Sequence, residues 1–137
     1  MSERFPRWVQ REIAKVPKRA ARGLAFFDKV EPKDWALCIT HPVNMSDPCG
    51  CIMGRLHGRY FAGCRLRGIH AVGPQAVAYG LMVPSSLFGG KRDRLTYRKA
   101  YFAAMDIEMN IGIESRKGQL ERIAHKTIPG ISSVVLG

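Results

Sequence analysis

The sequence lacks long apolar runs. No stretch reaches the roughly 18 consecutive apolar residues of a candidate transmembrane helix. The first residues, MSERFPRWVQREIAKVPKRAARG, also lack the uninterrupted apolar stretch of a secretory signal. A mitochondrial transit peptide is an alternative, because this segment is amphipathic and rich in Arg, but Glu3, Glu12 and Asp28 count against it. We therefore expect a cytoplasmic protein and no membrane partner, and the one membrane alternative is a basic amphipathic helix over residues 4–27 that lies on an anionic membrane.

Acidic residues are scarce. There are 11 Asp+Glu against 22 Lys+Arg, which gives a formal net charge of +11 and a pI of about 10.0. The excess is concentrated in three segments: residues 1–29 hold eight basic and three acidic residues, residues 50–70 hold four basic and none acidic, and residues 91–99 hold five basic and one acidic. Such a distribution is typical of proteins that bind nucleic acid or an acidic protein surface.

The sequence also lacks the patterns of common catalytic and metal sites. Its acids are scattered, its four histidines are isolated, and no paired-carboxylate or His-Glu-x-x-His pattern occurs, so we expect no enzyme activity and no cofactor. A structural zinc site that recruits Cys38, His41 or His70 is an alternative, but a Cys-x-Cys pair is not the usual zinc knuckle. We expect reduced, metal-free thiols that pack as small apolar groups, at Cys38, Cys49, Cys51 and Cys64.

The clearest feature that is present lies in the first 30 residues. If residues 4–27 are helical, apolar side chains fall on one face, and basic side chains recur three or four residues apart on another. Pro17 does not suit a helix interior, so we expect a kink or two shorter helices. The apolar face comprises Val9, Ile13, Val16, Ala20, Leu24 and Phe27, and the basic stripe comprises Arg4, Arg7, Arg11, Lys15, Lys18 and Arg22.

The other expected elements are helices joined by loops. Residues 31–47 are typical of a connector, Pro74 to Tyr79 of a short helix that Gly80 ends, and residues 82–94 of a loop. Thr96 can cap a further helix, which Gly112 and Gly118 are expected to interrupt. The residues expected on the core side of that helix are Ala100, Tyr101, Ala103, Ala104 and Ile107.

The sum of these elements predicts a mainly α, single-domain protein. We expect a small bundle of about four to five helices, with room for a short extended segment at the C-terminal end. Its parts are a basic amphipathic helical segment (1–30), a helical core domain (31–126) and an apolar tail (127–137).

The stretch from Pro48 to Cys64 is expected to form one central helix. In such a helix, Gly50, Gly54 and Gly58 would lie on one side and form a flat groove for a neighbouring backbone. Apolar residues would cover most of the remaining circumference. Arg55 and Arg59, one turn apart, would then form its one exposed basic edge.

A resemblance covers residues 47–108. The stretches DPCGCIMGRLHGRYFAG, AVAYGL and LTYRKAYFAAM resemble a group of small uncharacterised proteins from actinobacteria and their phages, which carry a Cys-Val-Leu-Gly-Gln-x-Phe-Gly-x-Tyr motif. This chain departs from the motif at Arg55, where the group often has Gln, and at His57, where it often has Phe. The resemblance implies a helical domain in the cytoplasm of a bacterium, or of the bacterial host if the chain is phage-encoded, and implies no activity. The matching residues are Cys51, Gly54, Gly58, Tyr60, Gly80, Leu95 and Thr96.

These observations predict a small basic accessory protein that binds nucleic acid or a nucleoprotein mainly through phosphate contacts. The alternative is a phage-type modulator that docks on an acidic surface of a host protein. Charge alone does not separate the two, and it leaves the oligomeric state open. Aromatic residues that could stack on bases are Trp8, Tyr60, Phe61, Phe88, Tyr97 and Tyr101. The predicted nucleic-acid-binding residues are Arg4, Arg7, Arg11, Lys15, Lys18, Arg22, Arg55, Arg59, Lys91, Arg92 and Arg94.

Overall fold

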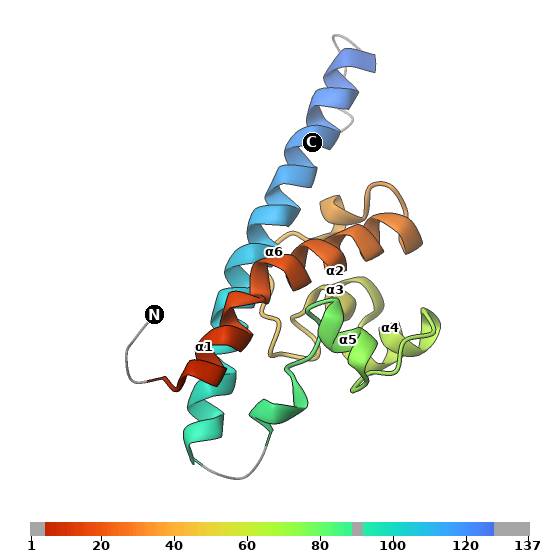
Figure 1. The fold of residues 1–137 in the computed structure, drawn as a ribbon. Helices are drawn as coiled ribbons and strands as arrows, with labels where there is room; N and C mark the ends of the chain where they lie inside the picture. Colours follow the sequence, from red (N-terminus) through yellow and green to blue (C-terminus); the bar gives the residue numbers. More distant parts are fainter. Residues whose placement is uncertain (1–4, 89–91, 128–137) are drawn as a thin grey trace.

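The computed structural model describes residues 5–88 and 92–127, and it is mainly helical, as predicted (Figure 1). A long helix, α6, runs the length of the molecule, and α2 crosses it, while α3, α4 and α5 lie below α2 in this view. In chain order the elements are α1 (Arg7–Ala14), α2 (Val16–Val30), the 3-10 turn η1 (Trp35–Cys38), α3 (Ile52–His57), α4 (Tyr60–Leu66), α5 (Pro74–Ala78), the 3-10 turn η2 (Ser85–Leu87) and α6 (Arg92–Thr127).

The N-terminal segment is divided into two helices next to Pro17, as the sequence predicts. Helix α1 ends at Ala14 and α2 begins at Val16, so Pro17 lies in the first turn of α2, where its missing N–H has no helical partner to lose. The prediction of a kink or of two shorter helices is therefore confirmed, in the second form. The expected apolar face is also confirmed, because all six of its residues are buried: Val9, Ile13, Val16, Ala20, Leu24 and Phe27.

Helix α6 is continuous, so the prediction that two glycines interrupt it is wrong. Gly112 instead lets α2 approach α6 closely, because a Cβ there would lie 2.1 Å from Leu24 Cδ1. The arginine one turn later reinforces the crossing: Arg116 Nη2 lies 2.7 Å from Asp28 Oδ2 of α2. Tertiary packing thus outweighs the weak helix propensity of glycine at this point.

The core side of α6 also differs from the prediction. Its buried residues recur every four positions, at Tyr101, Met105, Met109 and Ile113. Of the residues expected there, Tyr101 is buried and Ala100 and Ala104 are half-buried against the core, but Ala103 is exposed and Ile107 keeps 60% of its surface exposed. The alanines of α6 are small, so their spacing alone does not determine which side of the helix faces the core. The larger aromatic and Met side chains decide which side faces the core, because they bury more apolar area.

The predicted single helix from Pro48 to Cys64 is wrong. Helix α3 begins only at Ile52, where the Cys51 Sγ accepts a hydrogen bond from the Gly54 N–H at 3.3 Å, and the chain breaks again at Gly58. Gly58 has φ of +89°, a conformation that glycine adopts without strain. The expected glycine groove does not form, since a Cβ at Gly54 would meet only the preceding turn, 2.3 Å from Pro48 O.

The short helix α5 ends as predicted. Gly80 has φ of +70°, the Leu81 N–H donates to Ala76 O at 2.9 Å, and the Gly80 N–H donates to Val77 O at 3.0 Å. This pair of bonds is a Schellman cap. It turns the chain sharply after α5, which keeps α5 and Tyr79 against α2.

The connector before α3 is attached to α6 by side chains. Asp106 Oδ1 accepts from the Met45 N–H at 2.6 Å, and Asn110 bonds both backbone groups of Val43, at 2.8 and 3.2 Å. Asp106 and Asn110 are one turn apart on α6, so they bind an extended backbone much as a neighbouring strand would.

Candidate nucleic-acid interface

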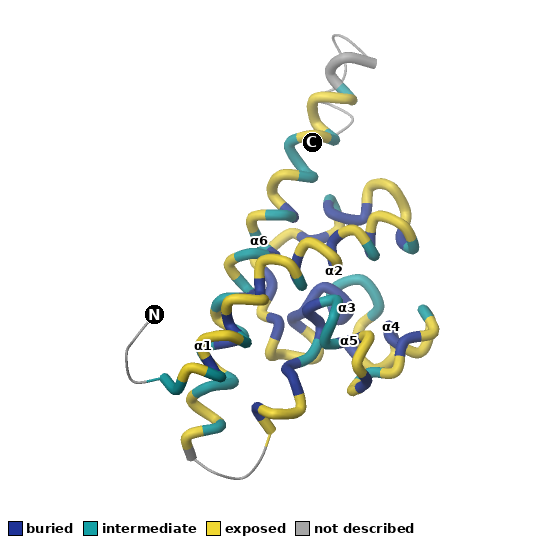
Figure 2. Tube along the Cα trace, in the orientation of Figure 1, coloured by how far each residue is buried: buried dark blue, intermediate teal, exposed yellow. Residues whose placement is uncertain are grey.

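The predicted basic stripe lies on the outward side of α1 and α2. Arg7, Arg11, Lys15, Lys18 and Arg22 are all exposed, whereas the apolar face of the same two helices is buried against the core. Figure 2 shows this alternation of exposed and buried residues along α1 and α2. The break at Pro17 does not interrupt the stripe, because Lys15 and Lys18 on either side of it both remain exposed.

Among the described residues, Lys15 alone of the stripe forms an ion pair with an acid. Lys15 Nζ forms an ion pair with Glu12 Oε2 at 2.7 Å. In the part of the chain that the structure describes, the other four stripe cations form no ion pair: Arg7, Arg11, Lys18 and Arg22. A positive potential therefore persists along this side of the molecule.

Glu12 binds two cations, Lys15 of the stripe and Arg19, which does not belong to the stripe. Arg19 Nη1 lies 3.2 Å from Glu12 Oε1 and also donates to the Tyr101 hydroxyl at 3.0 Å. Burial alone would raise the pKa of Glu12, but the hydrogen bonds and charges of Lys15 and Arg19 more than offset it, so this pKa is lower than usual. Arg19 is thus a structural cation that links α2 to α6.

Two other acids near α2 are also committed to structural pairs. Asp28 binds Arg116 and accepts from Trp35 Nε1 at 2.9 Å. Glu31 is buried and binds His57 Nε2 and Arg67 Nε, each at 2.8 Å. No local sequence pattern indicates the Glu31 cluster, because His57 and Arg67 are 26 and 36 residues away from Glu31 in the chain.

Three further predicted cations, Arg55, Arg59 and Arg94, lie on other elements than the stripe. Arg55 is half-buried and its Nη2 donates to Pro42 O at 2.9 Å, while Arg59 is exposed at the start of α4, so the expected basic edge of a single helix does not exist. Arg94 lies over the Trp8 ring, 5.4 Å from its centroid, and donates to Phe88 O. Arg4, Lys91 and the side chain of Arg92 lie outside the described residues.

The aromatic residues divide into core and surface groups. Tyr60 and Tyr101 are buried and offer no face to a ligand. Trp8 and Tyr97 pack edge to face at 5.9 Å between their ring centroids. Phe61 and Phe88 are exposed at 57% and 45%.

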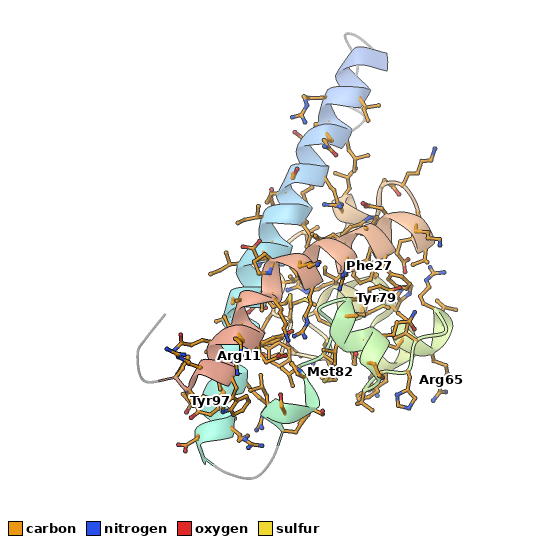
Figure 3. All side chains as sticks on the ribbon, viewed as in Figure 1. Arg11, Phe27, Arg65, Tyr79, Met82 and Tyr97 are labelled. Carbon is orange, nitrogen blue, oxygen red and sulfur yellow. The ribbon has the colours of Figure 1, made fainter. Side chains whose placement is uncertain are left out.

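The structure adds three residues to the end of the stripe that the sequence analysis missed. Lys29 lies two turns after Arg22 on the same side of α2, and Phe26 lies between them. The Phe26 ring stacks on Tyr79, with centroids 4.7 Å apart and planes 19° apart. Arg22, Phe26, Lys29 and Tyr79 line a surface hollow of about 430 Å³, and Figure 3 shows Tyr79 beside α2. The spacing of Lys29 was visible in the sequence, but the approach of Tyr79 depends on α5 packing against α2.

No cysteine belongs to the described stripe or lines this hollow. Cys51 and Cys64 are buried, Cys38 and Cys49 are exposed, and burial raises the pKa of both the Cys51 and the Cys64 thiol. Within residues 5–88 and 92–127, no three His, Cys, Asp or Glu side chains gather as a metal site would require. None of the helices in these ranges is both long enough and apolar enough to span a membrane.

Comparisons of the chain with protein-family models, with curated proteins and with solved structures gave no match. The resemblance of residues 47–108 to the actinobacterial and phage group therefore stays a prediction.

Proposed function

We propose that the protein is a small, non-enzymatic accessory protein that binds nucleic acid through the basic stripe of α1 and α2. The observation that carries the proposal is the row of five exposed cations, four of them without an ion pair among the described residues. Cations of this kind bind phosphates and release counterions, and they read no base sequence. Such binding would take place in the cytoplasm, of a bacterial host if the chain is phage-encoded.

The dimensions of the stripe suit a nucleic-acid backbone. Arg7 and Arg22 are 15 residues apart on two successive helices, so at 1.5 Å per residue the stripe spans at most about 22 Å. One strand of a duplex presents a phosphate about every 3.4 Å, so roughly six phosphates lie along that length. The stripe can therefore contact several phosphates at once without any change of fold.

The test is a triple variant, Arg7→Gln, Arg11→Gln and Lys18→Gln. Each lost phosphate contact should reduce the salt dependence of binding, so the slope of log affinity against log salt should become shallower by about 2.7 units on duplex and about 2 on single strands. Fluorescence anisotropy with labelled oligonucleotides, from about 50 to 200 mM salt, measures this slope. Because the three side chains are exposed, the fold should be unaffected.

A matched control separates the stripe from net charge. The variant Lys33→Gln, Arg65→Gln and Arg122→Gln removes the same charge from exposed positions elsewhere, and it should keep most of the slope. Equal losses in the two variants would mean that net charge alone attracts nucleic acid, which contradicts the proposal. If the stripe variant binds nucleic acid normally but loses an acidic protein that co-purifies with the wild type, the protein-docking alternative replaces it.

A further inference from the structure

We propose that the hollow at the end of the stripe holds one unpaired nucleobase, so that the protein prefers single-stranded to duplex nucleic acid. This inference rests on the proposed function, since the same stripe would carry the strand to the hollow. It names the class of nucleic acid that the site selects, which the stripe alone does not determine. The hollow is lined by Arg22, Ala25, Phe26, Lys29, Val30, Gln75 and Tyr79.

Two cations flank an aromatic ring on one face of α2. Arg22 lies one turn before Phe26, and Lys29 lies one turn after it. Cation, aromatic ring and cation therefore follow one another on a single face. A nucleotide has the matching order, with a flat base between two phosphates, so one ring can stack on the base while the two cations bind the flanking phosphates.

The aromatic surface of the hollow is formed in the absence of a ligand. The Phe26 ring meets the buried Phe27 ring edge to face, with centroids 5.7 Å apart, and it stacks on Tyr79. The backbone of Tyr79 lies directly against α2, because its carbonyl oxygen is only 2.0 Å from the position that a Cβ of Gly23 would take. Both rings remain half-buried, so neither is enclosed in the core. A platform of this kind costs little entropy when a base binds.

The hollow is large enough for one base, and only a single strand can place a base in it. The volume of about 430 Å³ falls within the roughly 300–1,000 Å³ of small-ligand sites. Duplex bases stack on one another and cannot reach a protein ring, whereas unpaired bases can be splayed out onto aromatic side chains. Duplex would therefore bind the stripe alone, and a single strand would bind the stripe and the hollow together.

The experiment compares two probes of equal charge. One is a fluorescein-labelled strand of about 16 thymidines, and the other is an abasic strand of the same length that keeps every phosphate. The wild type should bind the thymidine strand about tenfold or more tightly than the abasic strand, as one stacked base implies. Equal binding of the two strands by the wild type overturns the inference.

The variants Phe26→Leu and Tyr79→Leu locate the effect. Leucine keeps the apolar burial and removes the flat ring, so each variant should lose the preference for thymidine over abasic strands while its duplex affinity stays within about twofold. Phe61→Leu, which changes an exposed ring on α4, is the matched control and should keep the preference. A preference that persists in both hollow variants overturns the inference.

The two proposals fail in distinguishable ways. If the stripe variant loses its salt dependence and the two leucine variants behave as wild type, the stripe stands and the hollow is wrong. If the leucine variants lose the thymidine preference and the stripe variant binds normally, the hollow binds a base without the stripe, and the proposed function is wrong as stated.

Discussion

At the scale of single residues, the structure depends on acids that are held by cations from distant parts of the chain. Glu31 shows this best, since only 3% of its side chain is exposed and it binds both His57 and Arg67. Burial would by itself raise the pKa of Glu31, but the hydrogen bonds and charges of Arg67 and His57 outweigh burial and lower it. The charged carboxylate therefore joins the end of α2 to the ends of α3 and α4.

We expect Glu31→Ala to lower the free energy of unfolding by about 3 kcal/mol. Removal of one partner of a buried pair leaves the others without compensation, and the partial exposure of Arg67 keeps the loss at the lower end of the known range. Urea denaturation followed by circular dichroism measures the change. Glu114→Ala removes an acid with 73% side-chain exposure that pairs with Lys117, and should cost less than about 0.5 kcal/mol. Similar losses in the two variants would show that the Glu31 cluster has no special weight.

At the scale of elements, glycines decide how closely the helices approach one another. Gly23 in α2 lies against the backbone of Tyr79, whereas a Cβ at Gly118 in α6 would meet only the end of the Arg122 side chain, at 3.4 Å. The two positions share a residue type and a helical backbone. They differ only in what lies beside them, so one substitution can separate packing from helix propensity.

We expect Gly118→Ala to stabilise the protein by roughly 0.5–1 kcal/mol, because alanine favours the helix and little space is required. Gly23→Ala should instead destabilise it by about 1–3 kcal/mol, because a backbone carbonyl must move to make room. Thermal unfolding of the two variants measures both effects. The Gly23 variant should also lose the preference for thymidine over abasic strands, since α5 carries Tyr79 away from Phe26. An unchanged melting temperature for Gly23→Ala would show that α5 adjusts freely.

How far the sequence predicts each element depends on whether its determinants are local. The apolar face of α1 and α2, the break at Pro17 and the cap at Gly80 follow from residues within one or two turns, and all three are confirmed. The continuity of α6 through Gly112 depends on packing against α2, which is distant in sequence, and the predicted interruption is wrong. The break at Gly58 is a local glycine turn with φ of +89°, and the prediction of one helix through it is also wrong. The same holds for the site, since the stripe is a local pattern, whereas Tyr79 joins it only through tertiary structure.

At the scale of the whole molecule, the few acids near α2 act together on stability. The pKa values of Glu12, Asp28 and Glu31 are all lowered, that of Asp28 chiefly by its hydrogen bond from Arg116. A carboxyl whose pKa is lower in the folded state stabilises the fold while it is ionised, and this contribution disappears as pH falls through the folded pKa. Asp106 acts in the opposite sense, because burial raises its pKa.

We therefore expect the free energy of unfolding to fall as pH drops from about 5 to 3, with three lowered carboxyl pKa values outweighing one raised value. The difference in unfolding free energy between the wild type and Glu31→Gln should be largest near pH 7 and should shrink over the same interval, because protonated Glu31 resembles glutamine. Urea titrations at a series of pH values measure both quantities. A difference that stays constant down to pH 3 would contradict the assignment of charge to Glu31.

The length and position of α6 have a consequence for how the protein is made. Its residues Tyr101, Met105, Met109 and Ile113 close the core, yet α6 comes last among the described elements in chain order. A ribosome needs about 2–7 s to synthesise its 36 residues. Until then α1 and α2 lack their largest packing partner, although α2 can already contact Trp35 and α5. During that interval the nascent chain presents an apolar face and a cationic face side by side, which makes it a candidate client for a chaperone and places its cations close to ribosomal RNA.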